Sequence, residues 1–307
     1  MVFDLSQLSL SNAAGMVKTR ADARKLLGSA TTRIEIGSIM LDERPGNQGE
    51  TYYLDEQTMA SYNAMGLPNP APFADTLVWL GEFMVEAADQ GQQTVLNVAG
   101  STPAEYAEII DRAQESADHF VVNAGCGNFW QDNAQKAIPS YHPELLAEIL
   151  DAICAKVGTI RNVMVKISPI EEDRVDTLIA VAEVIAASPI VSEVIAVNTK
   201  INQRGVKPDG SPALAFRESQ GAELKHTGGM GGKLLKPEGL RVVREMRRLL
   251  PDCIKVVGCG GIFGGRDLLD YVDLGASGIQ VGTAFFTFGP KVFADILAEA
   301  DSILESA

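Results

Sequence analysis

The chain has 307 residues, 46% of them hydrophobic, so it can bury a large core, either as one barrel-sized domain or as two smaller ones. Its formal net charge of −14 and its lack of a basic stripe exclude nucleic acid as a partner, because binding to a phosphate backbone needs clustered Lys and Arg. No segment reaches the roughly 20 apolar residues of a membrane span, so we expect a soluble, cytoplasmic protein with no membrane partner.

Short runs rich in Val and Ile alternate with longer segments of helical period, which is typical of repeated βα units on a parallel sheet. The expected strands cover residues 8–14, 33–40, 93–99, 118–125, 162–168, 192–199, 253–258 and 277–283. Eight strands close a barrel. We therefore predict an α/β protein whose residues 1–307 form a single (β/α)8 TIM-barrel domain.

Six segments between these strands carry apolar residues at intervals of three and four, as amphipathic helices do. The expected helices cover residues 74–90, 102–117, 142–158, 173–188, 236–250 and 290–304. The second has a clear start, with Thr102 as N-cap, Pro103 in the first turn and Glu105 as the capping-box acid. Two stretches, 42–72 and 200–235, break the alternation and are predicted to be loops inserted at the C-terminal face of the barrel, where barrel enzymes carry their active sites.

Glycine-rich segments end the last two βα units: "KVVGCGGIFGG" at 255–265 and "GIQVGTAFF" at 278–286. Glycine lets backbone N–H groups approach an anion closely, so the pair predicts a phosphate site after strands seven and eight. Either motif alone is also explained by a tight βα turn. A third segment, "HTGGMGG" at 226–232, suits a backbone packed against a flat ring or a phosphate, and equally a flexible loop.

Polar side chains follow several apolar strands at the predicted rim. Lys166 ends the fifth strand, where a lysine is costly unless an anion meets it, although it could also snorkel outward or pair with a carboxylate. Asn123, Asn128 and Asn198 offer paired donors and acceptors that suit a pyrimidine, whereas a purely structural asparagine caps a turn.

Four cysteines are present, and none has the spacing of a metal site or a C-x-x-C pair, so we expect reduced thiols and no metal. Cys126 differs from the others because glycines and asparagines flank it in "NAGCGN". Alone it would read as a small buried hydrophobe. At a polar strand end, it is placed to accept or deliver a proton.

These motifs resemble the soluble class (class 1) of FMN-dependent dihydroorotate dehydrogenases over nearly the whole chain. The matching segments are "AMGLPN" (64–69), "NAGCGN" (123–128), "MVKIS" (164–168), "AVNT" (196–199), "GGMGGKLLKPEGL" (228–240) and "GCGGIFGGRDLLDYVDLGASGIQVGTAF" (258–285). The resemblance implies an FMN-bearing barrel that oxidises (S)-dihydroorotate to orotate in de novo pyrimidine (UMP) biosynthesis. It also implies a homodimer, with fumarate as the expected electron acceptor.

By this resemblance, Cys126 is the base that takes the C5 proton while C6 gives hydride to flavin N5, and Lys166 lies by flavin N1 and O2. The implied FMN-binding residues are Ala14, Gly15, Ser38, Asn97, Asn123, Lys166, Val197, Gly228, Gly229, Gly260, Gly261, Gly282 and Thr283. The implied substrate-binding residues are Asn63, Met65, Gly66, Leu67, Asn123, Asn128, Asn198 and Thr199. The backbone of residues 65–67 is expected to receive the substrate carboxylate.

A cysteine base also indicates the subclass. The membrane-bound, quinone-using class has a serine base and an N-terminal docking extension, whereas here the barrel is expected to begin almost at once. Two soluble types remain: the fumarate-reducing homodimers, and the class that passes electrons to NAD through an iron–sulfur partner subunit. Nothing in this chain supplies cluster ligands.

Two departures lie near the expected pyrimidine end of the flavin. The chain has Ala14 where the family has serine, and Gly37 where the family has a lysine that touches flavin and substrate. Losing a charge-assisted contact of that kind costs about 1.5–3 kcal/mol of binding unless a nearby cation such as Lys18 or Arg33 replaces it. Gly127 and the lid sequence "FWQDNAQKAIPSYHP" (129–143) also differ from the family.

Two further hypotheses therefore stay open. One is an FMN oxidoreductase that acts on another dihydropyrimidine or an enone. The other is a non-catalytic flavin- or phosphate-binding barrel that serves as a subunit.

Overall fold

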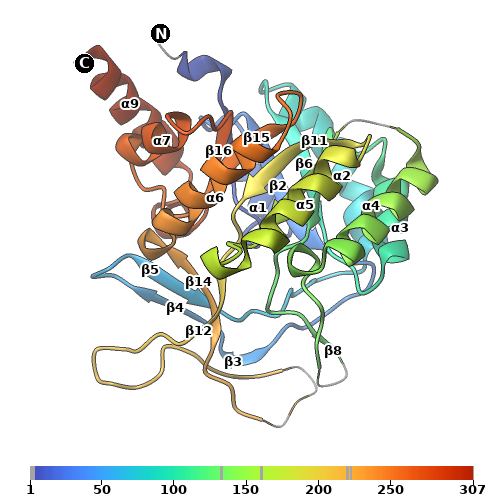
Figure 1. Ribbon diagram of the computed structural model, residues 1–307, viewed down its shortest axis with the longest axis horizontal. Coiled ribbons are helices and arrows are strands. Elements are labelled where there is room, and N and C mark those ends of the chain that lie inside the picture. The colour runs from blue at the N-terminus through green and yellow to red at the C-terminus, as the bar shows by residue number, and fades with distance from the viewer. Residues whose placement is uncertain (1–3, 132–133, 160–161, 219–220, 222, 307) are drawn as a thin grey trace.

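The computed structural model describes residues 4–131, 134–159, 162–218, 221 and 223–306. Its centre is a closed barrel of eight parallel strands (Figure 1). They are β1 (Ser9–Asn12), β2 (Arg33–Ile39), β6 (Gln93–Val98), β7 (His119–Asn123), β10 (Val163–Ile167), β11 (Val191–Ala196), β15 (Lys255–Cys259) and β16 (Gly278–Val281). The barrel closes because β1 pairs with β16 on one side and with β2 on the other. The eight-stranded barrel prediction is thus confirmed, with strand ends shifted by at most a few residues.

Helices surround this barrel, and all six that the sequence predicts are present. The α-helices are α1 (Arg20–Arg24), α2 (Phe73–Ala88), α3 (Pro103–Ala113), α4 (Pro143–Val157), α5 (Val175–Ala187), α6 (Lys236–Leu249), α7 (Gly265–Val272), α8 (Thr283–Phe288) and α9 (Lys291–Glu305). Short 3-10 helices lie at η1 (Leu5–Gln7), η2 (Pro139–Tyr141), η3 (Glu172–Arg174) and η4 (Lys233–Leu235). The predicted cap of α3 is also present, since the Glu105 amide donates to Thr102 Oγ1 over 3.4 Å. None of the helices in the described part of the chain is long and apolar enough to cross a bilayer.

The two inserted stretches lie at the carboxyl end of the barrel strands, as predicted, and both contain short strands. They form an antiparallel sheet in the order β12-β14-β5-β4, which lies beyond one end of the barrel in Figure 1. Its strands are β4 (Tyr52–Asp55), β5 (Ala60–Asn63), β12 (Lys200–Gln203) and β14 (Gly228–Gly232). Two smaller pairs join β3 (Gln48–Glu50) to β13 (Ala215–Arg217) and β8 (Trp130–Gln131) to β9 (Ala134–Gln135). Strands of two to five residues, some built of glycine, carry no apolar alternation that a sequence pattern could reveal.

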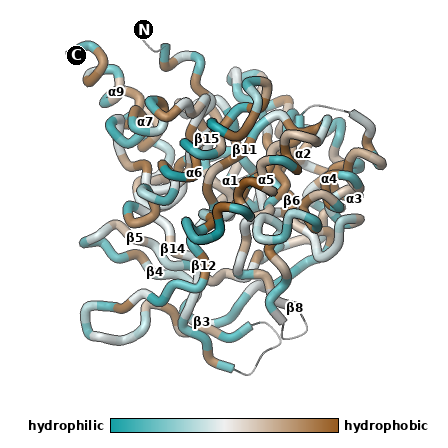
Figure 2. Tube along the Cα trace, viewed as in Figure 1, coloured by the Kyte–Doolittle hydropathy of each residue, from teal (hydrophilic) through white to brown (hydrophobic). Residues whose placement is uncertain are grey.

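The main core lies between the barrel and its helices, and a smaller one fills the barrel. On β2, Ile34 and Ile36 belong to the outer core, so the intervening Glu35 faces inward. The inner cluster includes Val95, Val121, Met164, Ile195 and Val257. Figure 2 shows hydrophobic segments around β11, β15 and α5, whereas the extended segments at the lower end are largely hydrophilic or neutral. The hydrophobic core thus lies in the barrel and its helices, while the inserted segments beyond the barrel are more polar.

Candidate active site

A pocket with an empty volume of about 1080 Å³ lies at the carboxyl ends of the barrel strands, under the β12-β14-β5-β4 sheet. Most of the residues that the sequence singled out line it. They are Ala14, Gly15, Ser38, Asn63, Met65, Gly66, Leu67, Asn123, Cys126, Asn128, Lys166, Val197, Asn198, Thr199, Gly282 and Thr283. The structure therefore brings together side chains from six different strand ends and from the inserted sheet.

The remaining predicted residues do not line the pocket themselves but lie next to residues that do. Asn97 accepts a hydrogen bond from Ser38 Oγ. In β14, a side chain at Gly229 would collide with Thr199 Oγ1, and one at Gly228 with the Asn63 carbonyl oxygen. Close packing of β14 thus requires these two glycines whether or not a ligand is nearby.

Gly260 and Gly261 form the turn after β15, with φ of +127° and +69°. These backbone angles favour glycine, so the turn by itself accounts for Gly260 and Gly261 in the sequence. The turn borders the pocket through Leu235, whose Cγ would lie 3.2 Å from a Cβ at Gly260. Gly282 itself lines the pocket, directly before α8.

Four asparagine side chains of the pocket form two hydrogen-bonded pairs. Asn128 Nδ2 donates to Asn63 Oδ1 over 3.0 Å, which joins the segment after β7 to the inserted sheet. Asn198 Nδ2 donates to Asn123 Oδ1 over 3.1 Å, which joins the ends of β11 and β7. The four amides therefore lie together at the predicted rim, and their hydrogen bonds to one another fix their orientations.

Cys126 lies at the end of β7 and borders both this pocket and a second cavity of about 550 Å³. Burial raises the pKa of its thiol, while the backbone N–H of Asn128 and the cations Lys18 and Arg44 act in the opposite direction. The thiol is therefore mainly protonated at neutral pH, and the nearby cations favour the thiolate that a base would need.

Lys18 is the cation that approaches Cys126 from the loop after β1. It lines the pocket, and its ammonium donates to the Ser38 carbonyl oxygen. Burial lowers its pKa to about 8, and Cys126 acts in the opposite direction. Lys18 is thus placed to meet an anionic ligand beside the thiol.

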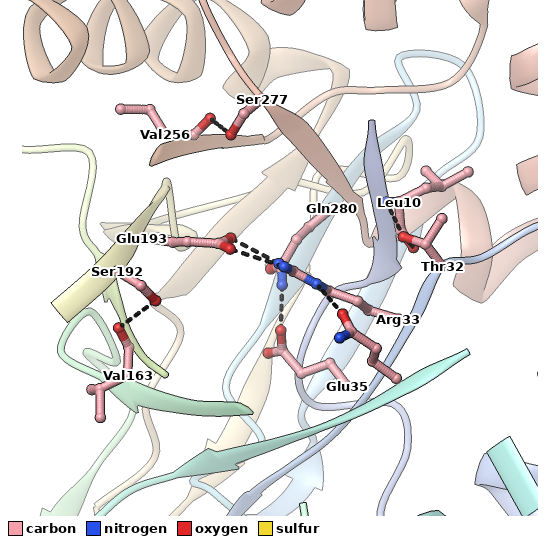
Figure 3. A network of polar contacts seen from close by, with 11 residues as sticks. Leu10, Thr32, Arg33, Glu35, Val163, Ser192, Glu193, Val256, Ser277 and Gln280 are labelled. Carbon is pink, nitrogen blue, oxygen red and sulfur yellow. Dashed lines mark hydrogen bonds and ion pairs between the residues drawn. The ribbon is translucent and has the colours of Figure 1, made fainter. Parts of the chain in front are cut away.

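The other candidate replacement, Arg33, is not in this pocket, and that expectation was wrong. Arg33 begins β2 and binds Glu193 with two hydrogen bonds of 2.7 and 2.9 Å at the amino end of the barrel (Figure 3). Its neighbours there include Ser9 and Ser277. Sequence proximity to Gly37 was misleading because a strand carries its first and last residues to opposite ends of the barrel.

Position 37 has a backbone conformation that favours glycine. Its φ is +128°, and a Cβ atom would collide with the Asn97 carbonyl oxygen. No side chain fits at position 37 without a shift of the neighbouring strand.

Lys166 projects from β10 into the same space, and it is not unpaired. Its Nζ donates to Gln280 Oε1 over 2.8 Å. Gln280 Nε2 in turn donates to the buried carboxylate of Glu35 (Figure 3). Asn97 Nδ2 donates to the second oxygen of Glu35 over 2.9 Å.

Sequence reasoning missed several residues of the pocket wall. Ser61 Oγ and Thr283 Oγ1 lie 2.9 Å apart, joining β5 to α8. Tyr52 and Phe286 pack with ring centroids 4.7 Å apart at the same edge. Recognising strands within residues 52–63 would have revealed them, because these strands place the side chains of Tyr52 and Ser61 beside the end of the barrel.

The segment 129–143, whose sequence differs from the lid of the family, is only partly described, because residues 132–133 lie outside the described part of the chain. Phe129 is buried against Met40, Ala99 and Leu67. The segment therefore packs beside the pocket.

The lining fits a flat anionic group. A Cβ on Gly15 would meet nothing within 4 Å, and one on Gly282 would meet only Ala13 Cβ at 3.5 Å. The charged residues that the structure places around the pocket are Lys18 and Lys166, and no carboxylate is among the lining residues it describes. A ring with a phosphate, such as a flavin nucleotide, suits both the open backbone and the charge.

The chain is also similar in sequence and fold to known proteins. A family model described as dihydroorotate dehydrogenase matches residues 7–304. The catalytic subunit of dihydroorotate dehydrogenase B (NAD(+)) from Anoxybacillus flavithermus is 29% identical over 275 residues, which cover 88% of this chain and 78% of the relative. A putative dihydroorotate dehydrogenase A (fumarate) from Aquifex aeolicus is 30% identical over 263 residues, which cover 85% and 76%.

Among solved structures, a dihydroorotate dehydrogenase from Eimeria tenella in complex with ferulenol has the same fold. The TM-score is 0.77 at 20% sequence identity, over 97% of this chain and 81% of the other. Since the family model spans nearly the whole sequence, the chain belongs to the dihydroorotate dehydrogenase family.

Proposed function

We propose that this protein oxidises (S)-dihydroorotate to orotate in pyrimidine biosynthesis, with FMN as its cofactor. One observation carries the proposal: a thiol, two lysines and four asparagines converge on one pocket at the carboxyl ends of a (β/α)8 barrel. Dihydroorotate is a small anionic ring with alternating N–H and C=O groups, and the amides and lysines of this pocket match those groups.

Lys166, Gly282 and Thr283 are the residues we propose to hold FMN. Lys166 would compensate negative charge on the isoalloxazine ring, while the backbone around Gly282 and the Thr283 hydroxyl would hold the phosphate. Gly260 and Gly261 would complete the phosphate site from the turn after β15. When bound, FMN would supply the acceptor for a hydride from C6 of the substrate.

Cys126 is the proposed base. Its sulfur would take the proton from C5, and the charge of Lys18 would favour the thiolate before that transfer. The neighbouring Asn123 and Asn128 would orient the substrate ring so that C5 faces the thiol.

Lys18 would take the role that Gly37 cannot fill. Its ammonium would meet the substrate carboxylate, together with the backbone N–H groups of residues 65–67. Since burial lowers its pKa to about 8, it is charged at neutral pH.

An anaerobic titration of the purified protein with dihydroorotate tests the proposal. The visible absorbance of bound flavin should bleach in proportion to the substrate added. A protein that binds FMN but is not reduced by dihydroorotate would contradict the substrate, and one that binds no flavin would contradict the cofactor.

A second substrate class is favoured by one specific observation, the absence of a lysine at position 37. If Lys18 does not bind the carboxylate, the pocket would favour a neutral dihydropyrimidine or an enone. The same titration with dihydrouracil and a simple cyclic enone separates these cases. A non-catalytic subunit would show FMN binding and no reduction by any of them.

We further propose a cytoplasmic homodimer that uses fumarate as its electron acceptor. The relatives include both fumarate and NAD(+) types, so the acceptor has to be measured. Rapid reoxidation of the reduced protein by fumarate but not by NAD(+) is the expected result. Light scattering after gel filtration should give twice the chain mass, and a monomer would contradict the dimer.

A further inference from the structure

Glu35 is a buried carboxylate that the proposed reaction does not use. It lies in the middle of β2, points into the barrel, and is fully buried. A carboxylate without solvent is costly unless hydrogen bonds or a cation compensate it. Two chains of hydrogen bonds end on its two oxygens, and both begin in the pocket.

The first chain joins Glu35 to Lys166 through Gln280. An ammonium group can only donate, so Lys166 requires the carbonyl oxygen of Gln280, which it binds over 2.8 Å. The amide NH2 of Gln280 must then face Glu35, and it donates to Oε2 there. The protonation of Lys166 thus fixes the orientation of Gln280 and makes Glu35 an acceptor.

The second chain joins Glu35 to the amide pairs of the rim. Asn97 Nδ2 donates to Glu35 Oε1 over 2.9 Å, and Ser38 Oγ donates to Asn97 Oδ1. Asn123 Nδ2 donates to Ser38 Oγ over 2.8 Å. Every donor in both chains points toward the carboxylate, as an ionised Glu35 would need. Burial raises the pKa of Glu35, while Lys166 and the hydrogen bonds from Gln280 and Asn97 act in the opposite direction and favour the ionised form.

We propose that Glu35 is a positioning residue, which holds Lys166 and Asn123 in the pocket and compensates the charge of Lys166. The consequence for the cofactor rests on the proposed function. With Glu35 ionised, part of the positive charge that Lys166 would offer to a reduced, anionic flavin is already neutralised. Glu35 would therefore lower the preference of the pocket for reduced over oxidised FMN.

A purely structural role would be the alternative, and the barrel contains a matched example. Glu193 is also an inward-facing, buried glutamate, and it pairs with Arg33 at 2.7 Å at the amino end (Figure 3). Glu193→Gln removes the same kind of charge from the same barrel, at a residue that does not line the pocket. It is therefore the control for general effects of losing a buried carboxylate.

The first experiment measures the midpoint potential of bound FMN in the full chain. For Glu35→Gln we expect at least a tenfold gain in affinity for reduced over oxidised FMN, a positive shift of about 30 mV for a two-electron couple. Arg33, the partner of Glu193, also acts to lower the pKa of Glu35, so Glu193→Gln should shift the potential less than Glu35→Gln does. An unchanged potential in Glu35→Gln, or an equal shift in both variants, would overturn the compensating role.

A second experiment does not depend on FMN. Urea unfolding of the full chain, without added flavin, is compared for Glu35→Gln, Lys166→Met and the double variant. Each single change leaves one buried charge uncompensated. The unfolding equilibrium constant of the double variant should therefore be at least tenfold smaller than the value obtained by multiplying the two single effects. Additive effects would overturn the coupling.

These two measurements separate the inference from the proposed function. If the wild-type chain bound no FMN, the proposed function would fail, while the unfolding cycle would still test the link between Glu35 and Lys166. If Glu35→Gln alone did not fold, the double variant would decide: folding would support charge pairing, and failure to fold would oppose it.

Discussion

At the scale of single residues, Cys126 carries the clearest prediction. Cys126→Ser should slow flavin reduction by dihydroorotate about 10²- to 10⁴-fold, because a serine hydroxyl is a far weaker base at neutral pH. FMN content should stay unchanged. Stopped-flow measurement under anaerobic conditions gives the rate, and Cys154→Ser on α4 is the matched control. Equal rates in the wild type and Cys126→Ser would remove the assignment.

The pH dependence follows from the raised pKa of the same thiol. Burial places it above its ordinary value of 9.0, so the thiolate fraction should grow about tenfold per pH unit through the neutral range. The rate of reduction at saturating substrate should therefore rise from pH 6 to 8 without a plateau. A rate that is flat over this range would show that another group is the base.

Lys18 is predicted to lower the stability of the fold while it strengthens substrate binding. Its pKa falls to about 8 in the fold from 10.5 outside it, so the unfolded chain binds this proton more tightly and the charged amine opposes folding at neutral pH. Wild-type stability should accordingly rise with pH between about 8 and 10.5. Lys18→Met should gain about 1–3 kcal/mol in urea unfolding at pH 7.

The same substitution should weaken substrate binding. Loss of a charge-assisted contact of about 1.5–3 kcal/mol should raise KM for dihydroorotate by one to two orders of magnitude. In the wild type, KM should rise above pH 8, and in Lys18→Met that rise should disappear. A KM unchanged by the substitution would place the substrate carboxylate elsewhere.

The sequence predicted most of the residues that line the pocket, but it did not predict the polar residues Glu35 and Gln280 inside the barrel. Cys126, Lys166 and the asparagines follow apolar runs, so the ends of parallel strands had to bring them together. Glu35 gave no such signal, since it stands within "RIEIGSI", where an ordinary strand could equally point it to solvent. Only closure of the barrel makes it an interior residue.

At the scale of elements, the predictable parts are those that carry their own pattern. The barrel strands and long helices have apolar periods, whereas β14 consists of "GGMGG" and exists because it packs between β5 and β12. Short strands stabilised mainly by their neighbours cannot be read from local sequence. The same close packing requires glycine at positions 228 and 229, which the sequence had suggested as ligand-binding residues.

Position 37 on β2 allows a test of such backbone constraint. Gly37→Ala should cost about 3 kcal/mol or more, because the new Cβ would collide with the Asn97 carbonyl oxygen and φ is +128°. Gly91→Ala also has a positive φ, +71°, but meets nothing within 4 Å, so it should cost only about 1 kcal/mol. Urea unfolding compares the two. Equal losses would mean that strain alone, and not the close approach of the neighbouring strand, requires glycine at position 37.

At the scale of the whole molecule, the proposed phosphate site connects flavin binding to the stability of the barrel. Gly260 and Gly261 follow β15 and Gly282 follows β16, and these two strands pair, so a phosphate held there would bridge the last two strands of the barrel. Ligand binding to the folded state alone stabilises it by about 1.4 kcal/mol per tenfold increase in concentration above Kd. Binding of FMN should therefore be visible in global unfolding.

FMN is expected to raise the unfolding free energy logarithmically with its concentration, and riboflavin, which lacks the phosphate, should do so only at much higher concentration. The difference isolates the contribution of the backbone at Gly260, Gly261 and Gly282 from that of the ring. Lys166→Met should weaken the effect of both ligands about equally, because we propose that it meets the ring. If FMN and riboflavin stabilised the chain equally, the phosphate site would be wrong even though the flavin pocket remained, because the glycines after β15 and β16 would then serve only the turns in which they lie.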